Sequence, residues 1–305
     1  MEPQAQVQPQ VQVQVQPRSR QVDIVLDPSL PATFVDVSNV VIHQFYAAVA
    51  AFRRAGVLAN LDTSSEAFRA KFIDNVVRAI KCGCAATSKN LVLLRDCPRR
   101  DVWRLDMFPG YKAGRDRRTD IKNKVPLDPT VFDLFFEHAA TTMGNPPVVH
   151  HPRMEADDCA YVLSKMVPKE MELVFLTNDN DYYQLTTKDG RRRVVNGRAR
   201  KWRDQDVARA LTFKVLTGDK SDSVPAAFHG CGPVTASRLC GMSEADLNKW
   251  LMEKKPDNSY LRNRTLIDLS CVPETLVSEF TEIYRVTTVT TVKRPGTKND
   301  SPCAA

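Results

Sequence analysis

The 305-residue chain lacks the residue patterns that mark several common classes of site. Its eight cysteines are scattered: Cys82 and Cys84 form the only close pair, and no CxxC is matched by a second one or by closely spaced histidines. A zinc site is therefore not expected. The sequence also contains neither a GxSxG motif nor a catalytic-cysteine signature, so it offers no evidence for a covalent nucleophile.

Long apolar runs are also missing. No stretch is long enough to cross a bilayer, and the start, MEPQAQVQPQVQVQVQPRSR, alternates Gln, Val and Pro without the apolar centre of a secretory signal. We therefore expect an intracellular protein with reduced thiols, neither secreted nor bound to a membrane, in the cytoplasm of a prokaryote or in a compartment of an infected host. Residues 1–28 are predicted to be a disordered tail, and residues 286–305 a C-terminal tail.

Positive charge is in excess and unevenly spread. The formal net charge is +7 and the pI is about 9.0. From Lys89 to Lys124 there are eleven Lys or Arg against five Asp, and from Lys188 to Arg203 there are eight against one Asp. Such runs are usually solvated faces, but beside an acidic site they indicate a polyanionic partner.

Apolar and amphipathic segments alternate along much of the chain. Strands are predicted at Thr33–Val37, Leu91–Leu94, Val148–Val149 and Leu173–Leu176, and helices at 38–55, at 65–81 and from Glu155 onward. This alternation predicts an α/β fold in which helices cover both faces of a parallel sheet. Beyond Trp202 the pattern becomes helical, with helices expected at 204–216, 233–240 and 243–253. These helices would form an appendage to the sheet.

Nine carboxylates form a candidate site, and Asp36, Asp96, Asp179 and Asp181 among them lie at the ends of predicted strands. Asp36 lies near the end of the first strand, and Asp96 and Asp179 follow the ends of later ones. Ligands of open parallel sheets bind beyond the carboxyl ends of the strands, so we expect these acids to meet there. Taken singly, members of the set also fit a helix cap, a helix N-terminus or a turn. The full set is Asp36, Asp96, Glu155, Asp157, Asp158, Asp179, Asp181, Asp219 and Asp222.

Carboxylates that are brought together in a partly dry cleft repel one another unless cations neutralise them. Oxygen ligands without paired Cys or His favour Mg²⁺, with Mn²⁺ as a substitute, over zinc. Two such ions, about 4 Å apart, can activate a water and clamp a phosphodiester for in-line displacement. The sequence therefore predicts two-metal phosphodiester chemistry, and the basic remainder of the chain would hold nucleic acid.

Two short segments carry candidate contacts to nucleic acid. In the first, Tyr111-Lys112-Ala113-Gly114-Arg115, the two cations share a face if the segment is helical, and both would meet the scissile phosphate. Tyr111 would stack on an unpaired base, and Arg104 precedes the segment in the same basic run. An ordinary surface helix is the alternative.

The second segment, Gly230-Cys231-Gly232-Pro233, has the form of a helix-hairpin-helix turn. Its glycines would let the backbone approach a phosphate, and the amides at the start of the following helix would point at it. Thr235 and Ser237 would add hydroxyl contacts. Contacts of this kind hold a duplex without reading its base sequence.

Taken together, these motifs resemble the phage and bacterial branch of the 5′ nuclease (flap endonuclease) family, the relatives of the nuclease domain at the start of bacterial DNA polymerase I. DVSN at Asp36 resembles the family's D-G-S-N, RD at Asp96 its F-D, and YKAGR its Y-K-x-N-R. The closest matches are EADD at 155–158, TNDNDYYQL at 177–185, and GDKSDSVP with GCGPVTASRL further on. Val37, Arg153 and Ala226 stand where the family often has glycine, and these departures leave every charge in place.

The resemblance implies a PIN-like α/β nuclease core at 29–204, a helical arch at about 104–137, and a helix-three-turn-helix subdomain of helix-hairpin-helix type at 205–285. It assigns Asp36, Asp96, Glu155, Asp157 and Asp158 to one metal group and Asp179, Asp181, Asp219 and Asp222 to a second. Lys112 and Arg115 would be the catalytic cations of the arch. Gly230 and Gly232 would hold the duplex backbone, where a K⁺ ion is an option.

The implied activity is that of a Mg²⁺-dependent, structure-specific 5′–3′ exonuclease and 5′-flap endonuclease. It would act as a monomer on DNA with a 5′ flap or 5′ end, and on RNA primers, in primer removal beside a replication polymerase, in repair or in recombination. One alternative is a 5′ nuclease that prefers RNA:DNA hybrids. Another is a DNA-junction binding protein whose chemistry has lapsed, although an idle cluster of nine acids would carry repulsion without any compensation.

Overall fold

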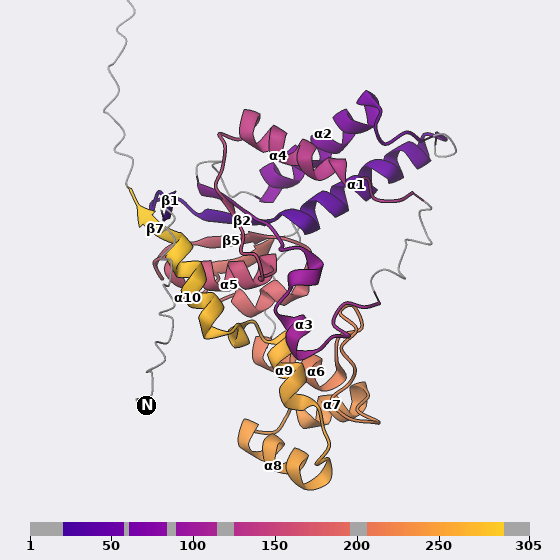
Figure 1. Ribbon diagram of the computed structural model, residues 1–305, viewed down its shortest axis with the longest axis vertical. Coiled ribbons are helices and arrows are strands. Elements are labelled where there is room, and N and C mark those ends of the chain that lie inside the picture. The colour runs from indigo at the N-terminus through magenta and orange to yellow at the C-terminus, as the bar shows by residue number, and fades with distance from the viewer. Residues whose placement is uncertain (1–20, 58–60, 84–89, 115–124, 196–205, 290–305) are drawn as a thin grey trace, which may run out of the picture.

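The structure is a computed structural model that describes residues 21–57, 61–83, 90–114, 125–195 and 206–289. A five-stranded parallel sheet forms its centre (Figure 1). In spatial order the strands are β4 (Val148–Val149), β3 (Leu91–Leu94), β2 (Ala32–Asp36), β5 (Leu173–Leu176) and β6 (Arg192–Val195). All neighbouring strands are parallel, so their carboxyl ends lie along one edge. The predicted α/β fold with a parallel sheet is confirmed.

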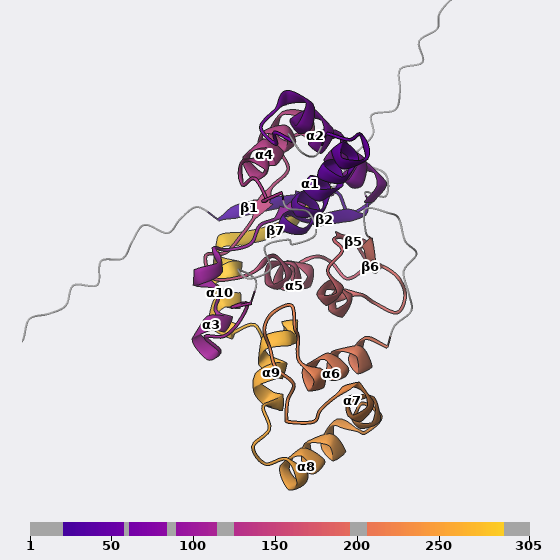
Figure 2. The ribbon, with the colours of Figure 1, turned by 90° about the vertical axis from the view of Figure 1, so that its right-hand side faces the viewer.

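Helices cover both faces of this sheet, as Figures 1 and 2 show. One face, which includes Val35 and Leu93, packs against α1 (Val37–Arg54), α2 (Glu66–Gly83) and α4 (Thr130–Thr142). The other face, which includes Phe34 and Val92, packs against α5 (Ala156–Met166) and α10 (Glu274–Ile283). Neighbouring residues of a strand point to opposite faces, which is why the buried strands read as continuous apolar runs.

A second, two-stranded sheet joins the two ends of the described chain. β1 (Val22–Leu26) runs parallel to β7 (Tyr284–Thr288), with Val22 opposite Tyr284. The predicted tail over 1–28 is therefore wrong at its end, and the boundary at 285 is wrong because it cuts β7. The Val-x-Ile-x-Leu alternation of β1 resembles the Val-Gln alternation near the start of the chain, so the sequence pattern alone does not distinguish β1 from the predicted tail.

The helices of the appendage have a core of their own. They are α6 (Val207–Thr217), α7 (Pro233–Leu239), α8 (Glu244–Lys254) and α9 (Tyr260–Ile267), and they lie together at one end of the molecule (Figure 2). Leu216, Leu239, Leu251 and Leu266 are buried among them. The predicted helices agree closely with these bounds, but α10, which was assigned to the same subdomain, packs on the sheet instead.

The proposed arch is the remaining departure from expectation. α4 covers the end of the predicted arch range, residues 130–137, and its Val131 and Phe135 are buried against α1 and α2. That end of the range is therefore part of the core, because the apolar spacing along α4 matches a core helix. α3 (Arg104–Met107) lies at the other end, and residues 115–124 are outside the described part of the chain. The short helices are η3 (Arg99–Asp101), η4 (Asn180–Leu185) and η5 (Leu269–Cys271).

None of the helices within the described ranges combines the length and the apolar character needed to cross a membrane.

Candidate active site

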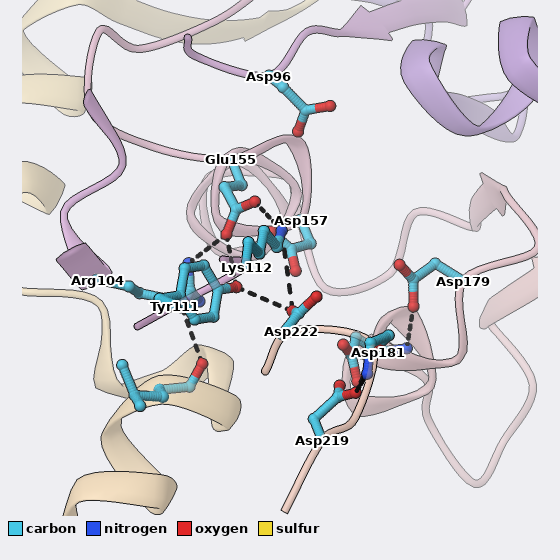
Figure 3. A network of polar contacts seen from close by, with 12 residues as sticks. Asp96, Arg104, Tyr111, Lys112, Glu155, Asp157, Asp179, Asp181, Asp219 and Asp222 are labelled. Atoms are coloured by element: carbon cyan, nitrogen blue, oxygen red, sulfur yellow. Dashed lines mark hydrogen bonds and ion pairs between the residues drawn. The ribbon is translucent and has the colours of Figure 1, made fainter. Parts of the chain in front are cut away.

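The carboxyl edge of the sheet brings together acids that are far apart in the sequence (Figure 3). Asp36 ends β2, Asp96 lies two residues beyond β3, and Asp179 lies three residues beyond β5. A cavity of about 200 Å³ at this edge is lined by Asp36, Asp96, Glu155, Asp157 and Asp179. Five of the nine candidate acids therefore face one small space, as the parallel topology predicts.

Asp36 is both a helix cap and a wall of this cavity. Its Oδ1 accepts a hydrogen bond from the Asn39 amide at 3.0 Å, which caps α1, and its Oδ2 accepts one from the Thr177 hydroxyl at 2.9 Å. Burial, and then the charge of Asp96, raise the pKa of Asp36 to about 7. A cation in the cavity would offset both effects, so the ionised form of Asp36 calls for positive charge there.

Asp96 and Asp157 frame the start of α5. Asp96 is half-buried, and its Oδ1 accepts a hydrogen bond from the Ala156 amide at 2.8 Å. Burial, and then the neighbouring Asp158, raise the pKa of Asp157 well above its ordinary value. Among the described residues, Glu155, Asp157 and Asp158 can offer oxygens within 4.8 Å of one another, a spacing that suits a metal ion.

Hydrogen bonds nevertheless set Asp158 apart from that group. This carboxylate is fully buried and is held in a two-pronged ion pair by Arg104, with Nη1 and Nη2 each 2.7 Å from one of its oxygens. Its Oδ2 also accepts from Trp103 Nε1 at 2.9 Å. Oδ1 accepts only the Arg104 donor, so it can take one further partner, and Asp158 stays a predicted ligand whose orientation Arg104 fixes.

Arg104 is likewise not the surface contact that was expected. Its side chain is 2% exposed and lies over the Trp103 ring at 4.6 Å. Besides Asp158, it donates to Glu155 at 3.2 Å and, through Nε, to the backbone carbonyl of Leu266 in α9 at 2.8 Å. Arg104 therefore joins the carboxylate edge to the helical appendage and is not available to DNA.

Tyr111 and Lys112 connect the two groups of acids. The Tyr111 hydroxyl lies 2.8 Å from Glu155 Oε2 and 3.0 Å from Asp222 Oδ2, and burial raises the pKa of Tyr111, so it remains a proton donor. Lys112 Nζ contacts Glu155 and lies 3.8 Å from Asp222 Oδ2. Glu155 of the first group and Asp222 of the second thus share two donors, as Figure 3 shows.

These contacts correct two expectations for the segment. The Tyr111 side chain is buried against the acids, so it does not present a face for base stacking. The segment is also not helical: Lys112 has a φ of 57°, in a run of turns. Helical spacing therefore does not relate Lys112 to Arg115, which lies outside the described residues.

The second group contains a cation that sequence reasoning missed. Lys214 Nζ, from α6, lies 2.7 Å from Asp219 Oδ2 and also contacts Asp181 Oδ1. Burial raises the pKa of Asp181 to about 6 in spite of this lysine. Asp219 accepts additional hydrogen bonds from Ser221, and with Lys214 these lower its pKa below the ordinary value, against the effect of burial.

The only sequence signal for Lys214 is its place five residues before Asp219, at the end of a predicted helix. Such a lysine resembles any surface cation near a helix C-terminus, where positive charge is common. A cavity of about 410 Å³ opens beside it, with Asp179, Asp181 and Asp219 in its wall. The protein's own ammonium group therefore offsets part of the negative charge of the second group, at Asp181 and Asp219.

The loop that carries Asp219 and Asp222 depends on one glycine. Gly218 has a φ of 76°, and a Cβ at this position would lie 2.4 Å from the Val224 carbonyl oxygen. The loop closes with backbone hydrogen bonds between Asp219 and Val224, at 2.9 and 2.8 Å. Only glycine permits this left-handed turn with the backbone so close.

The turn before α7 is open to solvent. Gly230 has a φ of 81°, Gly232 caps α7, and a Cβ at either glycine would meet nothing within 4 Å. The side chains on the first turns of α7 lie at the surface: Val234 is 86% exposed, Ser237 is exposed and Thr235 is partly so. This accessibility is compatible with a contact to a phosphate backbone, which stays a prediction.

The residues at the carboxylate edge fit a divalent cation. All the candidate ligands are oxygens, which is the donor set of Mg²⁺ and Mn²⁺. The hydroxyl of Tyr182, which lines the same cavity, is buried without a hydrogen-bond partner among the described residues. A hydrated ion would supply both the missing charge and the missing hydrogen-bond partner.

Known proteins resemble this chain in sequence and in fold. The sequence model of the family described as "5'-3' exonuclease, N-terminal resolvase-like domain" matches residues 31–214. The chain is 30% identical over 166 residues to the thermostable DNA polymerase I of Thermus filiformis, a match that covers 51% of this chain and 19% of that protein. It is 28% identical over 165 residues to DNA polymerase I of Deinococcus radiodurans, covering 51% and 16%. The chain thus matches less than a fifth of the length of these relatives.

Solved structures from bacteriophage T5 have the same fold. A T5 protein crystallised with metal ions matches with a TM-score of 0.55 and 19% identity, covering 83% of this chain and 97% of that one. A T5 flap endonuclease in a complex with DNA and metal ions matches with a TM-score of 0.56 and 17% identity, with the same coverage. The motif resemblance, the family match over more than half of the chain and this fold agree. The chain belongs to the family of 5′–3′ exonuclease N-terminal resolvase-like domains.

Proposed function

We propose that this protein is a divalent-metal-dependent nuclease that hydrolyses DNA as a 5′–3′ exonuclease and 5′-flap endonuclease. The observation that carries the proposal is the convergence of Asp36, Asp96, Glu155, Asp157 and Asp179 on one cavity at the carboxyl edge of the sheet. Membership of the exonuclease family supports the reaction class. The T5 flap endonuclease with the same fold was crystallised with DNA and metal ions, which supports the class of substrate.

The first metal group would consist of Asp36, Asp96, Glu155, Asp157 and Asp158, and Arg104 would orient Asp158. Asp179, Asp181, Asp219 and Asp222 would form the second group, and Lys214 would have to give way for an ion to bind Asp181 and Asp219 directly. We propose Mg²⁺ at both groups, with Mn²⁺ as a substitute. Bound there, the two ions would supply an activated water and stabilise the leaving oxygen of a phosphodiester.

The chain's own residues would hold and orient the substrate. Lys112 lies between the two groups and would meet the scissile phosphate when substrate replaces its contacts with Glu155 and Asp222. Arg115 would supply a second cation from the adjoining segment. The open turn at Gly230 and Gly232 would hold the duplex backbone, with Thr235 and Ser237 beside it and a K⁺ ion as an option.

In domain terms, we propose a nuclease core built on the five-stranded sheet, including β1, β7 and α10, with α6 to α9 as the helix-three-turn-helix subdomain. The enzyme would act as a monomer on 5′ flaps, on 5′ ends and on RNA primers beside a replication polymerase. Primer removal, repair and recombination are the processes that create such ends.

The test is a cleavage assay with 5′-labelled flap DNA and Mg²⁺ for the wild type, Asp179→Ala and Asp133→Ala. Asp133 is an exposed carboxylate on α4 that belongs to neither group. We expect Asp179→Ala to lose more than about 100-fold in rate, since even the loss of an outer partner of a metal ligand costs about 10–100-fold. Asp133→Ala should cleave as the wild type does, and chelation of Mg²⁺ should stop all cleavage.

The same assay separates the alternatives. Equal cleavage by the wild type and Asp179→Ala would show that the proposed metal site is wrong. Binding without cleavage by both proteins would instead favour a DNA-junction binding protein. An RNA:DNA hybrid with the same 5′ flap, cut faster than the DNA form, would favour the hybrid-specific nuclease.

A further inference from the structure

One polar atom in the carboxylate cavity has no partner in the protein. Tyr182 lies in η4, directly after Asp181, and its side chain is 1% exposed. The ring packs against Phe175 of β5, with 5.9 Å between the ring centroids. Its hydroxyl is the only buried side-chain nitrogen or oxygen among the described residues that lacks a hydrogen-bond partner. Buried polar groups are nearly always paired, so this hydroxyl needs an explanation.

The surroundings of the hydroxyl indicate what it faces. Tyr182 lines the cavity of about 200 Å³ at the carboxyl edge of the sheet. The charges that act on its hydroxyl most strongly are those of Asp36, Asp157, Asp96 and Asp179, in that order. All four are acceptors when ionised, yet none lies within hydrogen-bond reach of the hydroxyl. The hydroxyl therefore lies close enough to feel the acids that would hold a cation, but beyond direct hydrogen-bond reach of them.

A phenylalanine would fill the same place at a lower cost in folding free energy. It would keep the packing against Phe175 and would bury no unpaired hydroxyl. The tyrosine is therefore hard to account for by packing alone. It becomes explicable if the hydroxyl is satisfied in the working state of the site by something that enters the cavity.

A hydrated divalent cation has the required properties. Mg²⁺ gives up its waters reluctantly and keeps several of them even when carboxylates bind it. A cavity of this size holds an ion and a few waters, since each water occupies about 30 Å³ in the liquid. A water on the ion would span the gap between the carboxylates and the hydroxyl, as bridging waters do when polar groups lie beyond direct reach.

We propose that Tyr182 is a positioning residue of the metal centre, whose hydroxyl forms a hydrogen bond with a water held by the divalent cation of the first metal group, at Asp36, Asp96 and Asp157. The proposal rests on the proposed function, because it requires that a cation bind there. The bond orients the hydration shell, and the rigid packing of the ring fixes the direction of that shell relative to the sheet edge.

The test compares Tyr182→Phe with Tyr284→Phe as a matched control. Tyr284 is also buried, but its hydroxyl donates to the His150 carbonyl at 2.9 Å and accepts from the His150 amide at 3.1 Å. Two quantities are measured for each variant: the melting temperature in EDTA, and the dissociation constant for Mn²⁺ by isothermal titration calorimetry. Neither quantity depends on cleavage activity.

We expect opposite patterns from the two variants. Without metal, Tyr182→Phe should melt at or above the temperature of the wild type, because it removes an unpaired hydroxyl. It should bind Mn²⁺ about 10-fold more weakly, the lower end of the usual loss for an outer partner of a metal site. Tyr284→Phe should melt at a lower temperature and bind Mn²⁺ with unchanged affinity.

Three results would contradict this inference or the proposed function on which it rests. If Tyr182→Phe binds Mn²⁺ as tightly as the wild type, the inference is wrong while the proposed function stands. If it melts at a lower temperature in EDTA, the hydroxyl is satisfied within the protein and the inference is also wrong. If the wild type itself binds no divalent cation, the proposed function and the inference fall together.

Discussion

Arg104 provides the sharpest test of how the site is held together. Its guanidinium group is buried with the fully buried Asp158, and it makes four hydrogen bonds, to Asp158, Glu155 and Leu266. Replacing Arg104 by Met keeps an apolar stem of similar length but removes the charge. Asp158 would then be a buried carboxylate with Trp103 Nε1 as its one remaining side-chain donor among those described.

The expected cost follows from this geometry. Removing one partner of a buried ion pair costs about 3–5 kcal/mol, because the other charge is left uncompensated. A double variant, Arg104→Met with Asp158→Leu, removes both charges and should recover much of that loss, since apolar replacement of a whole buried pair is often close to neutral. The control is Arg78→Met, which breaks the exposed pair with Asp74 on α2 and should cost no more than about 0.5 kcal/mol.

Urea denaturation in EDTA, followed by circular dichroism, measures the stability of the wild type and all the variants without a contribution from bound metal. The difference between the double variant and the sum of the single variants, with Asp158→Leu included, gives the coupling energy. A loss below about 1 kcal/mol for Arg104→Met would refute the reasoning, because it would mean that water reaches Asp158. So would a double variant that is less stable than Arg104→Met.

Two further predictions concern the pH dependence of stability and the loop after α6. Burial, and then Asp96, raise the pKa of Asp36 from 3.8 to about 7 in the folded state. At a pH between these two values, the folded state therefore keeps a proton that the unfolded state has lost. Without metal, the wild type should therefore lose stability relative to Asp36→Asn as the pH rises from about 4 to about 7, by up to about 4 kcal/mol. A urea midpoint of the wild type that rises relative to that of Asp36→Asn over this pH range would contradict the prediction. Gly218→Ala should cost more than about 2 kcal/mol in the free energy of unfolding, because a Cβ would meet backbone of Val224 and Pro225 at a positive φ. Gly230→Ala, at a similar φ but in open space, should cost only about 1–2 kcal/mol, and equal losses in calorimetry would show that the close approach at Gly218 is not what matters.

Much of the scaffold was predictable because its signals are local. The apolar runs at 91–94 and 173–176 became strands with those bounds, and the acids that follow them reached a common edge as the parallel arrangement requires. Strand β6 was missed because Arg192 and Arg193 belong to a basic run, and charged side chains are tolerated on an edge strand. β1 was missed because its alternation resembles that of the segment before it.

The sequence by itself determined the strands and helices that have a clear apolar period, and it showed nine candidate carboxylates, several of them just beyond strand ends. These properties depend on the spacing of residues within one segment, which periodicity records directly. Tertiary structure alone decided the use of each carboxylate. Asp158 pairs with Arg104, Asp181 and Asp219 contact Lys214, and the Tyr182 hydroxyl is left without a partner among the described residues. The physical reason is that each of these outcomes depends on groups from separate elements that meet only after the sheet and helices have packed, and no spacing within one segment encodes that meeting.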